Sequence, residues 1–175
     1  FFVIKSENIN LKYLTTFLNS KVIAYWLKLE GKLQGNIYQI DKEPLMNIPL
    51  YKPESYNPFI ELFDIVHFIY SLKESIVENI NNSQLGLFFE SVIDGCFYDV
   101  YFNEELGKSS LSITDNVLNE LKIAGLSEEY EKDKIDDMVS RIRLLYNNMK
   151  IGIVQQRMRM YTVKSPSTLK PIIES

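Results

Sequence analysis

Two short apolar helical patterns that meet at residues 19 and 20 constrain the start of this chain more than any other feature. Apolar side chains recur at three- and four-residue steps and predict one stripe along a helical surface: Leu11, Leu14, Leu18, Val22, Tyr25 and Leu29. Asn10 is placed to cap the first helix. Asn19 and Ser20 favour hydrogen bonds to their own backbone, so we expect Ser20 to end one helix and cap the next. Gly31 is placed to end that second helix in a left-handed conformation.

The chain becomes polar after Gly31, and the sequence predicts a polar loop followed by a short strand. Gly31 and Gly35 let a backbone approach a partner closely, glutamine and asparagine can read base edges, and lysine reaches phosphates or guanine. The candidate DNA-binding residues in this part of the chain are Lys21, Lys28, Lys32, Gln34, Asn36, Tyr38 and Gln39. From the residues alone, an ordinary solvated loop between a helix and a strand explains the same polarity.

The order of these elements resembles the end of the target-recognition domain in bacterial DNA methyltransferases and restriction–modification proteins. The closest likeness is to the TaqI-like C-terminal specificity domain, and type I specificity subunits are more distant. The resemblance rests on Leu18-Asn19-Ser20-Lys21, on the Gly/Lys loop with Tyr38, and on the exit at Ile48-Pro49. It implies that residues 1–55 are the distal part of a lobe that binds double-stranded DNA.

A second run of residues resembles an acidic-aromatic segment that follows this lobe in the family. It comprises Ile93-Asp94 and Tyr98-Asp99-Val100-Tyr101, and nothing in it indicates chemistry. The resemblance further implies an upstream methyltransferase or nuclease domain of the same protein. That domain would use S-adenosylmethionine and methylate adenine, whereas the present residues would need no cofactor. Because the sequence begins at Phe1 without a methionine, we expect it to be a piece of a longer protein.

Charge is distributed unevenly along the chain, whose net charge is −4. Residues 1–52 carry seven lysines and four acidic residues, residues 53–137 carry five lysines and eighteen acidic residues, and residues 138–175 carry seven basic residues and one acidic residue. Local potential governs association with a polyanion, because salt screens charges beyond about 8–10 Å. Basic ends around an acidic middle fit a chain whose ends face DNA. Solvated helix faces explain the same runs.

Residues 56–150 are predicted to form a helical scaffold. Asn57 and Pro58 predict the N-cap and the first turn of a helix. We expect helices over 59–80, 85–102 and 115–123, separated by a turn at 79–84 and a loop at 103–110. Gly125 should end the third helix, and Ser127 should cap the last one. The apolar seam of that last helix is Ile135, Met138, Ile142, Leu145 and Met149. We expect it and the 59–80 helix to pack on each other or on a common partner.

Residues 151–175 form a basic C-terminal arm in this interpretation. Partial alternation of polar and apolar residues suggests an edge strand or an arm that follows phosphates, with a loose end after Ser165. Arg157 and Arg159 are the candidate DNA contacts. They belong to a basic cluster with Arg141, Arg143 and Lys150, which either binds phosphates or neutralises acidic residues of this chain, for example Glu128, Glu129 and Glu131.

Motifs for catalysis are missing from the sequence. Asn47-Ile48-Pro49-Leu50 lacks the second proline and the aromatic residue of an amino-methyltransferase loop, and no Gly-rich cofactor loop precedes it. His67 has no metal-ligand partner at a suitable spacing, so we expect no catalytic and no metal site. Cys96 falls in an apolar helical pattern and is expected to be a buried hydrophobe. One cysteine and the lack of a membrane-spanning run fit a cytoplasmic protein.

The sequence therefore predicts an α+β, predominantly helical chain. The hypothesis is that it binds duplex DNA in a sequence-specific way and positions a separate catalytic domain. A helical docking module that contacts proteins and not DNA is the alternative.

Overall fold

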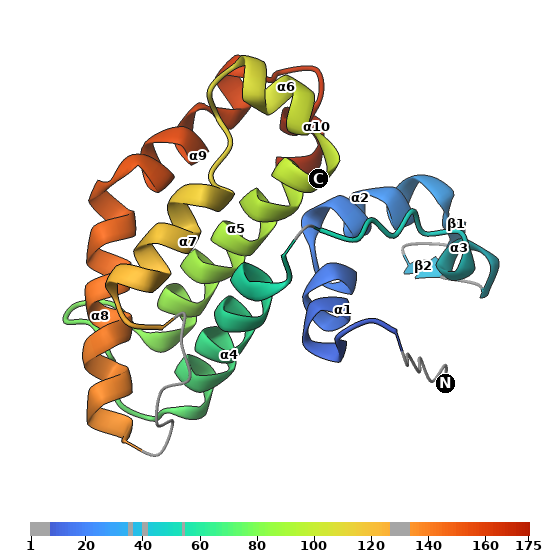
Figure 1. The fold of residues 1–175 in the computed structure, drawn as a ribbon. Coiled ribbons are helices and arrows are strands. Elements are labelled where there is room, and N and C mark those ends of the chain that lie inside the picture. Colours follow the sequence, from blue (N-terminus) through green and yellow to red (C-terminus); the bar gives the residue numbers. More distant parts are fainter. Residues whose placement is uncertain (1–7, 35–36, 40–41, 54, 127–133) are drawn as a thin grey trace.

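A computed structural model describes residues 8–34, 37–39, 42–53, 55–126 and 134–175, and it confirms a predominantly helical fold. Its helices form a bundle, and a smaller N-terminal lobe, defined here as the described residues between 8 and 53, projects from one side of it (Figure 1). The described strands belong to one short hairpin in this lobe.

The lobe begins with two short helices, α1 (Leu11–Leu18) and α2 (Lys21–Glu30). The Asn10 side chain accepts hydrogen bonds from the backbone N–H groups of Lys12 and Tyr13, and Ser20 Oγ accepts one from the N–H of Ile23. Both predicted caps are therefore confirmed. Gly31 does end α2, but the left-handed conformation predicted for it is wrong. Its φ and ψ of −75° and 156° are extended, because the chain passes directly from the helix into a strand.

A hairpin follows α2 where the sequence predicted a loop and one strand. Strands β1 (Lys32–Gln34) and β2 (Ile37–Gln39) pair in antiparallel fashion, with Lys32 opposite Gln39 and Gln34 opposite Ile37. The connecting residues Gly35 and Asn36 lie outside the described residues. Helix α3 (Lys42–Met46) comes next, and an irregular segment leads from it to the bundle.

The bundle is organised around its longest helix. It contains α4 (Asn57–Ser71), α5 (Asn82–Tyr101), α6 (Asn103–Lys108), α7 (Thr114–Ile123), α8 (Ile135–Ile151) and α9 (Ile153–Lys164). Helix α4 packs along α5, and α7 contacts both α4 and α8. The predicted packing of α4 and α8 on a common partner is therefore confirmed, and α7 is that partner.

Helix α4 ends nine residues earlier than the apolar pattern predicted. The amide of Asn82 donates to the carbonyls of Leu72 and Glu74, and its oxygen accepts from the N–H of Ile76. Arg143 also donates through two nitrogens, at 3.0 and 2.9 Å, to the Ile76 carbonyl. These hydrogen bonds satisfy backbone polar groups of the irregular segment that follows α4. Ile76 can therefore be buried in the core although it is not part of a helix.

Of the other predicted helix boundaries, some are confirmed by the structure and some are wrong. Asn57 is the first residue of α4 and does not cap it, although Pro58 lies in the first turn as predicted. Part of the predicted 103–110 loop is helix α6. Gly125 follows α7 with a φ of 66°, which confirms its role as a helix terminator. Ser127 and its predicted cap lie outside the described residues.

The C-terminal segment is helical, so the edge-strand interpretation is wrong. Val154 and Tyr161, seven residues apart on α9, are both buried, which is a helical and not an alternating pattern. The chain then turns into α10 (Leu169–Ile173), whose Leu169 and Ile172 are buried. Helix α10 packs on α2, so the loose end predicted after Ser165 is also wrong.

Ile142 lies in the core between helices, as its place in the α8 seam predicted. Its side chain is 0% exposed, whereas Leu144 on the same helix is 45% exposed. Replacing Ile142 with alanine should lower the free energy of unfolding by about 2–5 kcal/mol, because the substitution leaves a cavity. Leu144→Ala is the matched control and should cost much less. Urea unfolding measures both variants, and equal losses would contradict the packing described here.

Candidate nucleic-acid interface

The acidic-aromatic run on α5 anchors neighbouring elements. Asp99 Oδ2 accepts three hydrogen bonds, each 2.7 Å long, from the backbone N–H groups of Ile113 and Thr114 and from the Thr114 hydroxyl. These groups lie at the N-terminus of α7, where a carboxylate is favoured. Burial nevertheless raises the pKa of Asp99, and the bonds from Thr114 and Ile113 offset this in part. Asp99 therefore fixes the start of α7 against α5.

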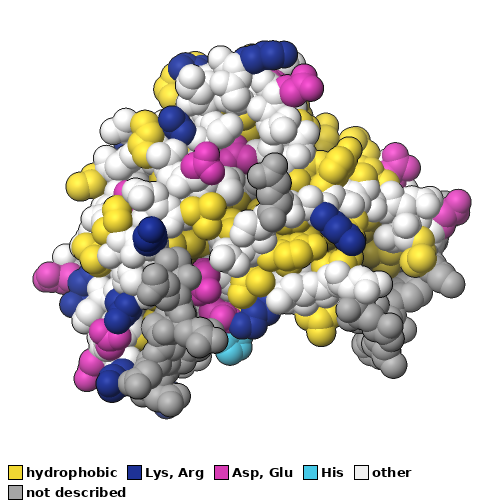
Figure 2. All heavy atoms as spheres, viewed as in Figure 1, with side chains coloured by type: hydrophobic (Ala, Val, Ile, Leu, Met, Phe, Trp, Pro, Cys, Tyr) yellow, Lys and Arg dark blue, Asp and Glu magenta, His cyan; other side chains and the backbone are white. Residues whose placement is uncertain are grey.

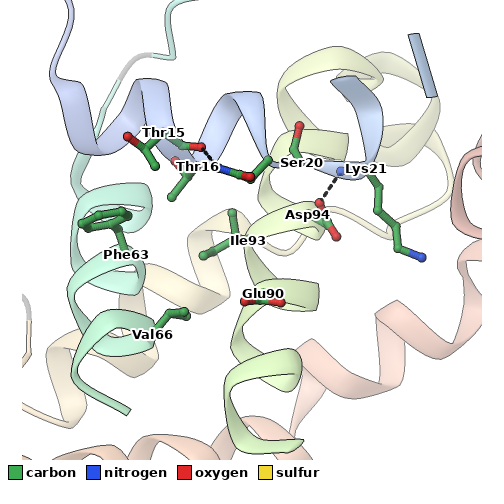
Figure 3. Close-up of a pocket in the computed structure, with 10 residues that line it drawn as sticks. Thr15, Thr16, Ser20, Lys21, Phe63, Val66, Glu90, Ile93 and Asp94 are labelled. Atoms are coloured by element: carbon green, nitrogen blue, oxygen red, sulfur yellow. Dashed lines mark hydrogen bonds between the residues drawn. The ribbon is translucent and has the colours of Figure 1, made fainter. Parts of the chain in front are cut away.

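Asp94 connects the same helix to the lobe. Its Oδ1 accepts a hydrogen bond of 2.8 Å from the backbone N–H of Lys21, the first residue of α2 (Figure 3). Burial raises the pKa of Asp94 to about 6; its contacts with Lys21 lower the pKa, and the neighbouring carboxylate of Glu90 raises it further. The N-terminus of α2 is thereby held to the bundle by a carboxyl group of α5.

Two tyrosine hydroxyls hold the segment that leaves the lobe. Tyr101 on α5 donates to the carbonyl of Pro49, and Tyr13 on α1 donates to the carbonyl of Tyr51 at 2.7 Å. The rings of Tyr51 and Tyr101 also meet edge to face, with centroids 5.0 Å apart. The exit from α3 therefore runs against both α1 and α5, which restricts how the lobe can lie on the bundle.

Figure 1 places the hairpin at the end of the lobe that lies away from the bundle. Lys32, Gln34, Tyr38 and Gln39 are on its two strands. Asn36 lies outside the described residues. Lys21 and Lys28 are exposed on α2, but the ammonium of Lys21 donates to the carbonyl of Ile173 at 2.8 Å. The structure thus places Lys32, Gln34, Tyr38 and Gln39 on one hairpin and Lys28 on the helix before it, whereas Lys21 lies at the junction with the bundle.

The arginines of the C-terminal segment do not lie on the lobe, and most of those discussed here donate hydrogen bonds to acceptors of the same chain. Arg157 Nη1 donates to the Ser112 carbonyl and, at 2.7 Å, to Asn116 Oδ1, whereas Arg159 is exposed. Arg141 similarly donates to the carbonyl of Gly125. Both Arg157 and Arg159 are on α9, on the opposite side of the molecule from the hairpin (Figure 1). The sequence offered acidic residues of this chain as possible partners of the basic cluster, but it gave no signal for the backbone and amide oxygens that Arg157 and Arg141 bind.

An apolar surface covers part of the lobe, and the sequence did not reveal it. Figure 2 shows hydrophobic side chains gathered where α2 and the segment after α3 lie. The large hydrophobic residues exposed in this region are Leu29, Met46, Leu50 and Tyr51. Leu29 and Met46 are 65% and 73% exposed. Contiguous exposed apolar surface of this kind is typical of sites that contact another macromolecule.

Two cavities lie next to the lobe. One of about 410 Å³ lies between the α1–α2 junction, α4 and α5 (Figure 3). Another of about 700 Å³ lies between the exit segment, the end of α5 and α7, where Arg157 is one of the lining residues.

In the part of the chain that the structure describes, no three His, Cys, Asp or Glu side chains gather as metal ligands. His67 is exposed on α4, beside the ring of Phe63 at 6.3 Å. Cys96 is fully buried, as predicted, and burial raises the pKa of its thiol. None of the helices within the described ranges is long and apolar enough to cross a membrane.

Comparison with known proteins finds partial similarity to type II restriction–modification proteins. The chain is 40% identical over 47 residues to the type II methyltransferases M.HincII and M.HindII of Haemophilus influenzae, which covers 26% of this chain and 9% of each relative. It is 28% identical over 138 residues to RM.MjaORFECS2P of Methanocaldococcus jannaschii, which carries the name of a type II restriction enzyme and methyltransferase. That match covers 77% of this chain and 11% of the relative.

The chain thus spans about a tenth of the length of these relatives. A match covering 77% of the chain necessarily includes its middle, so the similarity reaches into the helical bundle and is not confined to the first 55 residues. No protein-family model matches the chain, and no solved structure matches it.

The two arginines proposed as DNA contacts should differ in their effect on stability. Arg157→Gln should lower the free energy of unfolding by about 1–2 kcal/mol, because it removes charged hydrogen bonds to Ser112 and Asn116. Arg159→Gln should change it by less than about 0.5 kcal/mol, since that side chain is exposed. Thermal or urea unfolding tests both. An equal loss in the two variants would show that the Arg157 contacts do not stabilise the fold.

Proposed function

We propose that this chain is a DNA target-recognition region of a restriction–modification methyltransferase, of the TaqI-like specificity type. The observation that carries the proposal is the position of the β1–β2 hairpin. It extends from the bundle on a projecting lobe and brings Lys32, Gln34 and Gln39 together on two paired strands (Figure 1). A two-stranded ribbon fits the major groove of duplex DNA, and lysine and glutamine suit phosphate contact and base readout there.

The similarity to restriction–modification proteins supports this assignment, since proteins of that class act on DNA. The bundle would serve as a scaffold that sets the direction of the lobe, because α5 anchors both the start of α2 and the exit segment. Phosphate contacts from Lys28 and Lys32 would fix the register, and the polar residues of the hairpin would read bases. Tyr38, Gln39 and Asn36 belong to the same proposed contact.

The catalytic step is assigned to another part of such a protein. A methyltransferase domain that binds S-adenosylmethionine would modify the base, while the present residues select the site. A protein that binds and modifies cellular DNA would lie in the cytoplasm, where that DNA is.

A helical module that docks proteins is the alternative function. The exposed apolar residues Leu29, Met46, Leu50 and Tyr51 favour it, because apolar surface of this kind suits a protein partner better than a polyanion. A recognition lobe and a docking surface can also coexist on different sides of one region.

Salt dependence of duplex binding separates the two functions. Counterion release predicts that log K falls linearly with log salt, with a slope of about −0.9 for each phosphate contact. We expect duplex DNA to shift in a native gel and the shift to weaken steeply as salt rises. Arg159→Gln should reduce the slope by about 0.9 if α9 also contacts phosphates. A chain that binds no duplex even at low salt would contradict the recognition function and favour docking.

Replacing Gln34 and Asn36 with alanine should relax the preference for particular bases. Each good base contact is worth about 1–3 kcal/mol of discrimination. A matched control is Asn147→Ala with Gln156→Ala, which removes the same two amide types from exposed positions on α8 and α9. Competition between a random duplex pool and a selected sequence measures the preference. If the hairpin variant keeps the selectivity of the control, these two residues do not read bases.

A further inference from the structure

Helix α2 carries the hairpin, and the bundle holds this helix from two sides. Among the described elements outside the lobe, α5 and α10 make its main contacts. One residue joins both of them: the backbone N–H of Lys21 donates to Asp94 of α5, and its ammonium donates to the carbonyl of Ile173 at 2.8 Å. Lys21 and Ile173 are 152 residues apart in sequence, so the C-terminal segment contacts the lobe directly.

The buried side chains of α10 are apolar, as expected for a helix that packs on α2. Leu169 and Ile172 belong to the same core as Val22 and Ile23 in the first turn of α2. Figure 1 places α10 between α6 and the start of α2. The last carbonyls of a helix lack partners within it, so the ammonium of Lys21 also satisfies the end of α10.

Helix α10 has five residues, and a helix of this length has little stability of its own. Contacts from outside must therefore fix its position. Glu105 on α6 supplies two of them, because its carboxylate oxygens accept hydrogen bonds from the hydroxyl of Ser165 and, at 2.8 Å, from that of Thr168. Both residues lie in the turn before α10, and the carbonyl of Ser165 accepts from the N–H of Leu169.

The Ser165 hydroxyl depends on this carboxylate. Ser165 is 1% exposed, so water cannot replace the acceptor without a change in the surrounding packing. A buried hydroxyl that loses its partner is costly, which favours rearrangement of the turn and of the short helix that follows it. The contacts of Glu105 are thus well placed to determine where α10 lies.

We propose that residues 165–173 form a brace that fixes the direction of α2, and that Glu105 on α6 holds this brace in place. Glu105 orients the turn, the turn begins α10, α10 packs on α2, and α2 leads through Gly31 into β1. Glu105 is a positioning residue for the hairpin, although the hydrogen bonds that it accepts come from the C-terminal segment. The proposal describes the free protein and does not rest on DNA recognition, so either can fail without the other.

Hydrogen exchange of backbone amides, followed by NMR on the whole chain without DNA, tests the brace. In Glu105→Ala, the protection factors of the α2 amides should fall on the order of 10-fold, because α10 loses bonds that hold it against α2. The amides of Val92 and Phe97 inside α5 should keep their protection. Glu104→Ala is the matched control and should leave α2 unchanged, since this neighbouring carboxylate is exposed and pairs with Lys108 at 3.8 Å.

Variants of Lys21 test the other end of the brace without removing a buried group. Lys21→Met keeps a side chain of similar length and removes the ammonium, so the protection of the α2 amides should again fall. Lys21→Arg keeps a cationic donor and should restore most of it. Because both sites act through α10, Glu105→Ala combined with Lys21→Met should lower protection by less than the product of the two single fold-changes.

The distance between two spin labels reports the direction of the lobe itself. Met46→Cys on α3 and Asn147→Cys on α8 are exposed positions for the labels, and the native Cys96 is buried and so does not compete for them. In double electron–electron resonance, the distance distribution should broaden when Glu105→Ala is added to this labelled pair. It should not broaden with Glu104→Ala.

Two results would overturn the role of Glu105. One is equal α2 protection and equal distance distributions in Glu105→Ala and Glu104→Ala. The other is a parallel loss of protection at Val92 and Phe97 in Glu105→Ala, which would show that the C-terminal segment supports the whole fold and not the lobe in particular. Unchanged α2 protection in Lys21→Met would overturn the claim that α10 fixes the direction of α2.

Discussion

Helix α5 is the structural element on which the rest of this molecule depends, because its polar side chains bind the backbone of three other segments. Asp94 accepts from the start of α2, Asp99 from the start of α7, and Tyr101 donates to Pro49. Backbone groups at helix ends and in irregular segments need partners when they leave water. One buried helix supplies those partners at defined positions, and so it determines where the lobe, α7 and the exit segment lie.

This arrangement matters for the proposed function because a recognition element must be held in a defined direction. The hairpin is small and two-stranded, and an isolated hairpin of this kind has little stability of its own. It gains support through α2, which is tied to α5 by Asp94 and to α10 by Lys21. Similarity to the M. jannaschii protein extends through the middle of the chain, which fits a lobe and bundle that work together.

Sequence periodicity predicted the parts of the fold that local interactions determine. The caps at Asn10 and Ser20, the break between α1 and α2, and the buried seam of α8 from Met138 onward all follow from neighbouring residues, whereas Ile135 of the predicted seam is exposed. The end of α4 was missed because the segment after Ser71 is satisfied by side chains outside it, namely Asn82 just downstream and Arg143, which is distant in sequence. The C-terminal strand was a wrong reading of a partial alternation. For the candidate site, residue types indicated a polar loop and one strand and missed the second strand of the hairpin, and the anchoring carboxylates depend on tertiary contacts.

Hydrogen–deuterium exchange of the whole chain with and without duplex DNA tests the central claim most directly, since it locates the contact on the molecule. At low salt, we predict that duplex DNA slows exchange in residues 32–39 and in the exposed part of α2. The buried interior of α5 should stay unchanged, because it acts as a support and not as a contact. Slower exchange confined to α8 and α9, or none in any segment at a saturating DNA concentration, would contradict the account.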